Sequence, residues 1–281
     1  MRSVSKIAIS YVVNNIKSSK MIAALLMIIV AIYLRGTPIT YYSDYIGYNV
    51  NIGLLAFIIS DRFVLSVMFI AVVFIFSDMP FKHPKQYYMI VRMGKRKWIF
   101  AHLIYCIIIS LFIMLVSIIA FLVVMRGHTY FSNSWGKFIS SVPETIFTYE
   151  SGIELSIYKD VLLTLKPAEA LSWTMIMHFF ILMLFASICI TFNLLVNEYA
   201  GIIICGILVF AHLIQGFDPS FIINYMSPVD WISVNIIDFN CNSAMPDWYY
   251  PLIISIIIIA GLWIVNAIVT RKNSITLEKL L

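Results

Sequence analysis

The chain has 281 residues, of which 62% are hydrophobic and 12% are charged, and its mean hydropathy is +0.95. An ordinary soluble domain has roughly 45–50% apolar and about 25% charged residues, so this composition excludes a soluble enzyme, a disordered chain and a disulfide scaffold. It predicts a membrane protein with several spans. The net charge of +5 follows from topology, as shown below, and does not indicate nucleic-acid binding.

Residues 1–19 predict an amphipathic helix with a basic polar side. The apolar face consists of Val4, Ile7, Ala8, Tyr11 and Val12, and the opposite face of Lys6, Ser10, Asn14 and Lys17. Such a helix is suited to lie along the inner membrane surface and to connect to the first span. The alternative is a basic flank that only orients that span.

Six apolar segments follow, and each is close to the length of about 20 residues that a membrane helix needs. We expect these spans at 21–41, 54–76, 98–125, 170–196, 200–217 and 248–269. The predicted fold class is an all-α integral membrane protein in which residues 1–281 form one transmembrane domain. Asn197, Glu198 and Tyr199 alone separate the fourth and fifth spans, which predicts a tight helical hairpin.

The basic residues are distributed unevenly over the two sides that six spans would create. The side with both termini carries 13 of the 19 Lys and Arg residues, and Asp78, Glu198 and Glu278 are its acidic residues. The opposite side is acidic. Because basic loops stay in the cytoplasm, we expect both termini to be cytoplasmic.

The loop at 77–97 is the most informative cytoplasmic segment. Pro84 and Gly94 are typical of the two ends of a short helix at 85–93. This helix is too short to be stable alone in water and places two tyrosines among cations, so we expect it to dock on a partner. The candidate docking residues are Lys82, His83, Lys85, Gln86, Tyr87, Tyr88, Met89 and Arg92.

The sequence from Tyr87 to Trp98 is Tyr-Tyr-Met-Ile-Val-Arg-Met-Gly-Lys-Arg-Lys-Trp, and Ile-Phe-Ala-His-Leu follows. This stretch resembles the junction between the second and third spans of bacterial ABC transporter permeases of the type-2 export class. The layout of nearly the whole chain is similar to that family as well. One departure is the long outer loop at 126–169, because these exporters more often place their main outer elaboration before the sixth span.

The resemblance implies a permease subunit in the bacterial cytoplasmic membrane that exports a peptide or an amphiphilic molecule. Its partners would be an ABC ATPase, which binds ATP and Mg, and a second permease, identical or a sister chain. The helix at 85–93 would be the coupling helix, and Asn197, Glu198 and Tyr199 a second cytoplasmic contact. The chain itself lacks the G-x-x-x-x-G-K-[ST] motif of an ATPase, so we expect neither enzymatic activity nor a cofactor in it. The alternative function is a membrane-embedded immunity protein that sequesters a peptide without transport.

The outer side contains two long segments, at 126–169 and 218–247. We expect a short helix within 153–165 of the first, and short re-entrant or outer-surface helices in the second, because non-helical backbone at membrane depth needs cover from protein or water. The second has three prolines and neither Lys nor Arg.

Asp61 and Arg62 lie within the second predicted span. They could line a substrate path or an outer gate. Alternatively, Asp61 caps a helix near the outer end of the span, and Arg62 extends to the headgroups. His102, His178 and His212 lie singly in apolar runs, so we expect no metal site.

Overall fold

The computed structural model describes every residue except 1, 81–93, 142–154, 156, 216–220 and 272–281. It is mostly helical (76%). Four of the described helices are long and apolar enough to cross a membrane, which confirms a multi-pass all-α membrane protein. They are α2 (Ser19–Ile46), α6 (Lys95–Val124), α10 (Pro167–Leu195) and α13 (Tyr249–Arg271).

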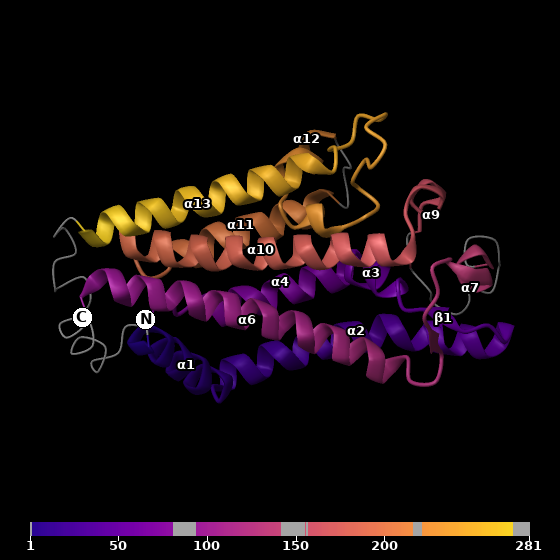
Figure 1. Cartoon of the computed structure of the whole chain (residues 1–281), viewed down its shortest axis with the longest axis horizontal. Coiled ribbons are helices and arrows are strands. Elements are labelled where there is room, and N and C mark those ends of the chain that lie inside the picture. The colour runs from indigo at the N-terminus through magenta and orange to yellow at the C-terminus, as the bar shows by residue number, and fades with distance from the viewer. Residues whose placement is uncertain (1, 81–93, 142–154, 156, 216–220, 272–281) are drawn as a thin grey trace.

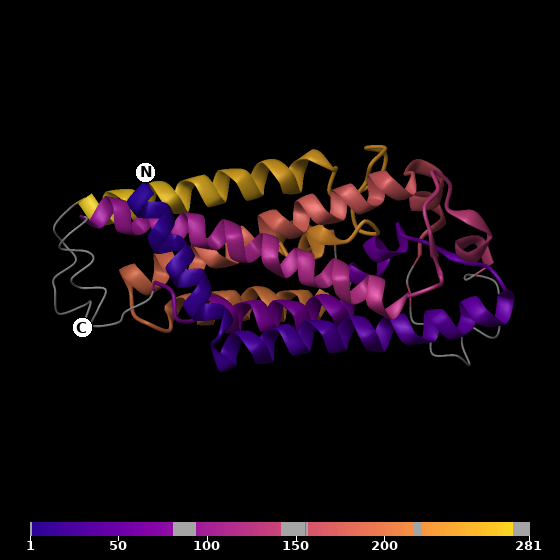
Figure 2. The ribbon, with the colours of Figure 1, turned by 60° about the horizontal axis from the view of Figure 1, so that its bottom comes forward.

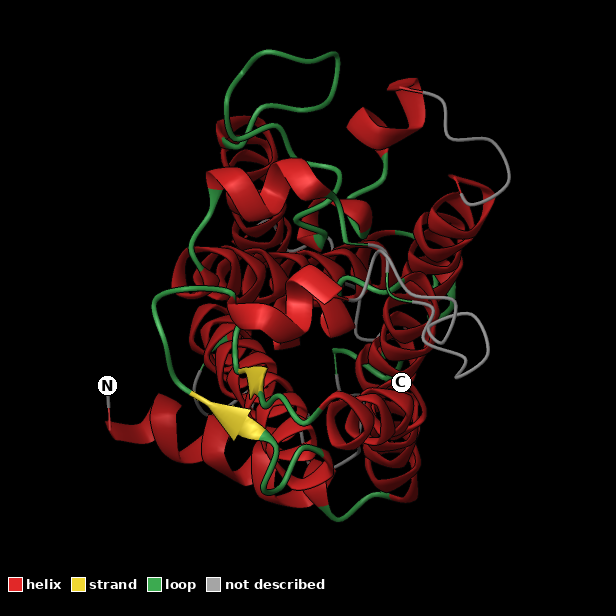
Figure 3. Cartoon of the chain, turned by 90° about the vertical axis from the view of Figure 1, so that its right-hand side faces the viewer, coloured by secondary structure: helices red, strands yellow, loops and turns green. Residues whose placement is uncertain are grey.

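The long helices run side by side with two shorter apolar helices, α4 (Arg62–Phe76) and α11 (Ala200–Gln215) (Figure 1). Helix α1 (Arg2–Ile16) begins, and α13 ends, at the same end of this bundle (Figures 1 and 2), which we call the terminal end. We call the opposite end the far end; it faces the viewer in Figure 3. It carries β1 (Val50–Asn51), β2 (Thr129–Tyr130), α7 (Gly136–Ser141) and α9 (Lys159–Thr164).

Helix α10 is the centre of the bundle and α13 lies at its edge. In an 18-residue apolar stretch of α10, 72% of the residues are buried, compared with 11% in α13. Helix α10 packs against α13, α11, α6 and α4. Neutral hydrogen bonds join α13 to it: Trp263 Nε1 donates to Ser187 Oγ (2.9 Å), and Asn266 Nδ2 donates to Thr191 Oγ1 (3.0 Å). Such bonds between polar side chains are a common way to join helices in lipid.

The predicted second span at 54–76 is not one helix. It divides into α3 (Leu54–Ile59) and α4, because Asp61 adopts an extended backbone and caps α4. Asp61 Oδ1 accepts a hydrogen bond from the amide of Val64 (3.1 Å). The interpretation of Asp61 as a helix cap is therefore confirmed, and the cap divides the predicted span into two helices.

Helix α1 is amphipathic as predicted, but its apolar face packs against α6. Val4, Ala8, Tyr11 and Val12 are buried. The ring centroid of Tyr11 lies 5.0 Å from that of His102, and the side-chain amide of Asn15 donates to the hydroxyl of Tyr105. The face predicted to lie on the membrane surface is thus covered by protein.

The far end is held together by the segments that follow α2 and α6. Strands β1 and β2 form a parallel pair, with Val50 opposite Thr129. The buried side chain of Asn51 donates to the carbonyls of Ser132 and Ser134 (both 2.9 Å), and its Oδ1 accepts from the amide of Gly53 (2.9 Å). This one carboxamide thereby satisfies three backbone groups.

The segment before α13 contains two short helices, α12 (Phe221–Met226) and η2 (Asp230–Ile232). The residues around η2 enter the bundle: Trp231, Ile232 and Val234 are buried, and η2 packs against α10. In the other predicted outer segment, α9 is a short helix within 153–165, as expected.

Candidate functional site

The predicted coupling residues between Lys82 and Arg92 lie outside the described residues, but both ends of their loop are described. Helix α4 ends at Phe76, and α6 begins at Lys95 directly after Gly94. Gly94 has a φ of 84°, a conformation that a residue with a Cβ adopts only under strain. This junction therefore favours a glycine, because glycine adopts a positive φ without a steric penalty.

Asn193, near the end of α10, joins this loop to the turn between α10 and α11. Its Nδ2 donates to the carbonyls of Ser77 (3.3 Å) and Met79 (2.6 Å), and its Oδ1 accepts from the amide of Gly201 (2.8 Å). We call these four residues the Asn193 clasp. The Asn193 side chain is buried, so it satisfies backbone groups that would otherwise lack partners in an apolar environment.

The α10–α11 turn is tight because Gly201 lets the two helices approach closely. A Cβ on Gly201 would lie 2.6 Å from the Cα of Cys189 and 2.8 Å from Asn193 Oδ1. The sulfur atoms of Cys189 and Cys205 are 3.7 Å apart in the same contact. A larger residue at position 201 would therefore separate α11 from α10 and disturb the clasp.

The predicted second contact, Asn197–Tyr199, is exposed at the tip of this turn. Asn197 Oδ1 accepts a hydrogen bond from the backbone amide of Tyr199 (3.0 Å). Tyr199 itself is 67% exposed. The Asn193 clasp thus brings this contact and the start of the 77–97 loop together. Sequence reasoning missed Asn193, although a lone carboxamide within an apolar run is a signal for such a role.

The terminal end is basic, and an exposed ion pair joins two of its described segments. Lys20 Nζ lies 2.6 Å from Asp78 Oδ1, so the start of α2 contacts the 77–97 loop. Lys95, Arg96 and Lys97 begin α6. Burial raises the pKa of Tyr11 to about 12, against the opposing effect of its hydrogen bond with Trp98. Tyr11 therefore stays neutral in the contact between α1 and α6.

The break between α3 and α4 holds a largely buried ion pair. Arg35 Nε, from α2, lies 3.0 Å from Asp61 Oδ1, and only 8% of the Asp61 side chain is exposed. The Arg35 guanidinium also lies over the ring of Phe63, 5.2 Å from its centroid. Asp61 is therefore both a helix cap and the anion of an interhelical ion pair, whereas the neighbouring Arg62 is exposed.

The second buried pair is His212 of α11 with Asp230 of η2. Their Nδ1 and Oδ1 atoms are 2.6 Å apart, and each side chain is 2% exposed. The other ring nitrogen, Nε2, lies 3.3 Å from the carbonyl of Arg62. Each ring nitrogen of His212 thus faces an oxygen atom, and the tautomer of the ring decides which nitrogen donates.

His212 lies alone in an apolar run of the sequence, whereas the structure gives it a buried partner, Asp230. Its partner lies in a segment that reads as a loop in the sequence, so no local pattern connects the two. The Arg35–Asp61 pair, the His212–Asp230 pair and the contact of His212 with Arg62 join α2, the α3–α4 break, α11 and η2. Within the described part of the chain, no group of three His, Cys, Asp or Glu residues could hold a metal ion.

Comparisons with models of protein families, with curated proteins and with solved structures found no match. The class of the protein is therefore defined by its fold and composition, which are those of a multi-pass helical membrane protein.

Proposed function

We propose that this chain is the permease subunit of an ABC exporter that moves a peptide or an amphiphilic substrate, while a separate ATPase hydrolyses ATP. The observation that carries the proposal is the Asn193 clasp. It ties the loop that resembles the coupling segment of type-2 exporters to the exposed α10–α11 turn, at the basic end of the bundle. Two surfaces suited to one partner are thereby held side by side.

We further propose six spans. The four long helices form four of them, α3 together with α4 forms another, and α11 forms the last. Helix α11 has 16 residues, a length of about 24 Å at 1.5 Å per residue, somewhat less than the hydrocarbon thickness of about 30 Å. An even number of crossings agrees with α1 and α13 at the same end (Figure 1). The basic residues of the terminal end support a cytoplasmic location for it under the positive-inside rule.

In this proposal, closure of the ATPase pair pushes on the predicted helix at 85–93, which follows α4 and precedes α6 in the chain. The Asn193 clasp passes the displacement to α10 and α11. Differential contacts with the two states of the ATPase supply the energy. Asp61 caps α4 and Arg62 is its first residue, and we assign both to the outer gate.

Copurification tests the proposal. A tagged chain is expressed together with the ATPase encoded beside it, and the ATPase that elutes with the membrane chain is measured. We expect a stable complex that is lost when Tyr87, Tyr88 and Arg92 are replaced by alanine. Two tyrosines and an arginine of the far end serve as the matched control: Tyr41 and Tyr45 are each 69% exposed, and Arg126 is exposed too.

The alanine variants at Tyr41, Tyr45 and Arg126 should leave the complex intact. If no ATPase copurifies with the unmodified chain and none is encoded beside it, the exporter function is wrong. The immunity protein then becomes the better explanation. If both triple variants lose the ATPase equally, the docking surface is not at the 77–97 loop.

The orientation can be tested with a native thiol. Of the four cysteines, Cys241 alone is exposed, and it lies in the loop between η2 and α13. We expect a membrane-impermeant maleimide to label Cys241 in intact cells, and a Cys241→Ser variant to remain unlabelled. Labelling confined to inside-out vesicles would place the far end in the cytoplasm and reverse the topology.

A further inference from the structure

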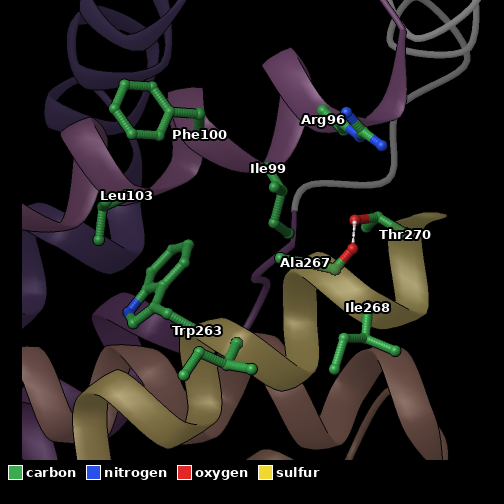
Figure 4. Close-up of a pocket in the computed structure, with 9 residues that line it drawn as sticks. Arg96, Ile99, Phe100, Leu103, Trp263, Ala267, Ile268 and Thr270 are labelled. Carbon is green, nitrogen blue, oxygen red and sulfur yellow. Dashed lines mark hydrogen bonds between the residues drawn. The ribbon is translucent and has the colours of Figure 1, made fainter.

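An apolar groove opens between α6 and α13 at the terminal end, in a part of the molecule that the proposed coupling does not use. It has a volume of about 480 Å³. Its walls are Ile99, Phe100 and Leu103 of α6 and Trp263, Ile264, Ala267 and Ile268 of α13. Figure 4 shows Arg96 and Thr270 together at one end of it.

Arg96 is the basic residue among those that line this groove. The Thr270 hydroxyl donates to the carbonyls of Asn266 (2.8 Å) and Ala267 (3.1 Å) of its own helix, so it is already engaged. Arg96 is exposed at the first turn of α6. The flanking Lys95 and Lys97 have the same charge but do not line the groove, because neighbouring residues on a helix project in different directions. The groove therefore combines an apolar wall with one guanidinium at its end.

We propose that this groove binds an anionic phospholipid, with the phosphate on Arg96 and an acyl chain along the apolar wall. A guanidinium bonds phosphate oxygens in a bidentate manner, and basic pockets between membrane helices bind anionic headgroups. From Arg96 to Leu103 is seven residues, or about 10 Å along α6. This is about two-thirds of one leaflet of a hydrocarbon core roughly 30 Å thick, so the groove matches the upper part of an acyl chain.

The position of the groove favours a lipid over a second copy of the chain. Helix α13 lies at the edge of the bundle and exposes Ile264 and Ile268 (60% and 50%). A copy docked here by two-fold symmetry would bring the basic start of α6 toward the same residues of its partner, and like charges repel. An anionic headgroup compensates that charge. The site would exist whether or not the chain works with an ATPase.

Native mass spectrometry of the purified chain tests this site. Phosphatidylglycerol and phosphatidylcholine with identical acyl chains are added separately, and the lipid-bound fraction is measured. We expect preferential binding of phosphatidylglycerol. Arg96→Gln should weaken its binding by about fivefold, which corresponds to about 1 kcal/mol for one basic side chain near an anionic surface. Arg96→Lys should restore much of this binding.

Lys97→Gln is the matched control, because it removes the same charge one residue away and should leave lipid binding unchanged. Ala267→Phe fills the groove and should weaken binding of both lipids. Equal losses in Arg96→Gln and Lys97→Gln would show a general basic surface and overturn the proposal. Equal binding of the two lipids by the unmodified chain would overturn it too, as would a dimer mass that Ala267→Phe abolishes while lipid binding persists.

Discussion

The two ends of the bundle are each tied by one buried carboxamide, whereas two buried pairs that each include an aspartate join helices between the ends. Asn51 at the far end and Asn193 at the terminal end each satisfy three backbone groups through one buried carboxamide. Between the ends, Asp61 pairs with Arg35 and Asp230 with His212. Removing one partner of a buried ion pair leaves an uncompensated charge, which costs more than losing a neutral hydrogen bond.

This difference indicates which parts of the molecule can move. The two buried pairs make α2, the α3–α4 break, α11 and η2 costly to separate. At the terminal end, the neutral Asn193 clasp and the exposed Lys20–Asp78 pair join the 77–97 loop to its neighbours, and both contacts cost less to break. Under the proposed function, the ATPase would push on the terminal end. The weaker contacts would then lie next to the predicted docking loop, where movement is needed.

The largest expected effect is the loss of the buried pair at η2. Asp230→Leu or His212→Leu alone should destabilise the chain by about 3–5 kcal/mol, because the remaining group stays buried without its partner. The double variant should be less destabilised than either single variant. Unfolding in detergent measures both, and Asp160→Asn on exposed α9 is the control. A double variant as unstable as the sum of the two singles would show that the groups do not act as a pair.

The second-largest effect on stability is expected at the two buried asparagines. Asn193→Ala and Asn51→Ala should each cost about 1–3 kcal/mol, because each leaves buried backbone groups unsatisfied. Under the proposed function, only Asn193→Ala should also reduce the stimulation of the partner ATPase, measured as ATP hydrolysis in the reconstituted complex. If Asn51→Ala reduces it equally, the loss reflects stability alone and the clasp has no special role in coupling.

A smaller effect is expected at the exposed ion pair of the terminal end. The Lys20 and Asp78 side chains are 54% and 57% exposed, so solvent and salt screen their attraction. Lys20→Ala should change the free energy of unfolding by no more than about 1 kcal/mol, and added salt should reduce even this difference. A loss as large as that of Asp230→Leu would contradict the contrast between exposed and buried pairs.

The smallest effect is expected on the rate at which the Cys241 thiol reacts with a maleimide. Desolvation raises the pKa of the Cys241 thiol, and the hydrogen bond and negative charge of Asp247 and the charge of Asp238 raise it further. The thiolate is the reactive form, so maleimide labelling at pH 7.5 should be slow and should accelerate as the pH rises past the usual range of a thiol. Asp247→Asn should speed labelling at pH 7.5. An unchanged rate would show that Asp247 does not influence this thiol.

The pKa of Asp238, in the same loop, is lowered and not raised. Burial opposes its ionisation, but hydrogen bonds from Ser243, Asn240 and Asn242 outweigh it and lower the pKa to about 2. Its contribution to the order of this loop is therefore complete above the usual pKa of an aspartate and is lost as the pH falls through about 2.

Much of the helical layout could be predicted, because a helix in lipid must satisfy its own backbone and expose apolar side chains over a fixed length. The predicted spans at 98–125, 170–196 and 248–269 differ from α6, α10 and α13 by at most three residues at each end. Six crossings and their orientation remain predictions. The division of 54–76 was missed because an aspartate that caps a helix and one that lines a pathway have the same sequence signal.

By itself, the sequence determined that this chain is a helical membrane protein, because its apolar content cannot be buried in a soluble fold. Its uneven charge also indicated which end to expect in the cytoplasm. Only the tertiary structure decided which polar residues meet. His212 and Asp230 are 18 residues apart along the chain, and Asn193 and Met79 are 114 apart. Helix packing, and not local periodicity, brings these residues together, because a buried polar group must find its partner on whichever element lies beside it.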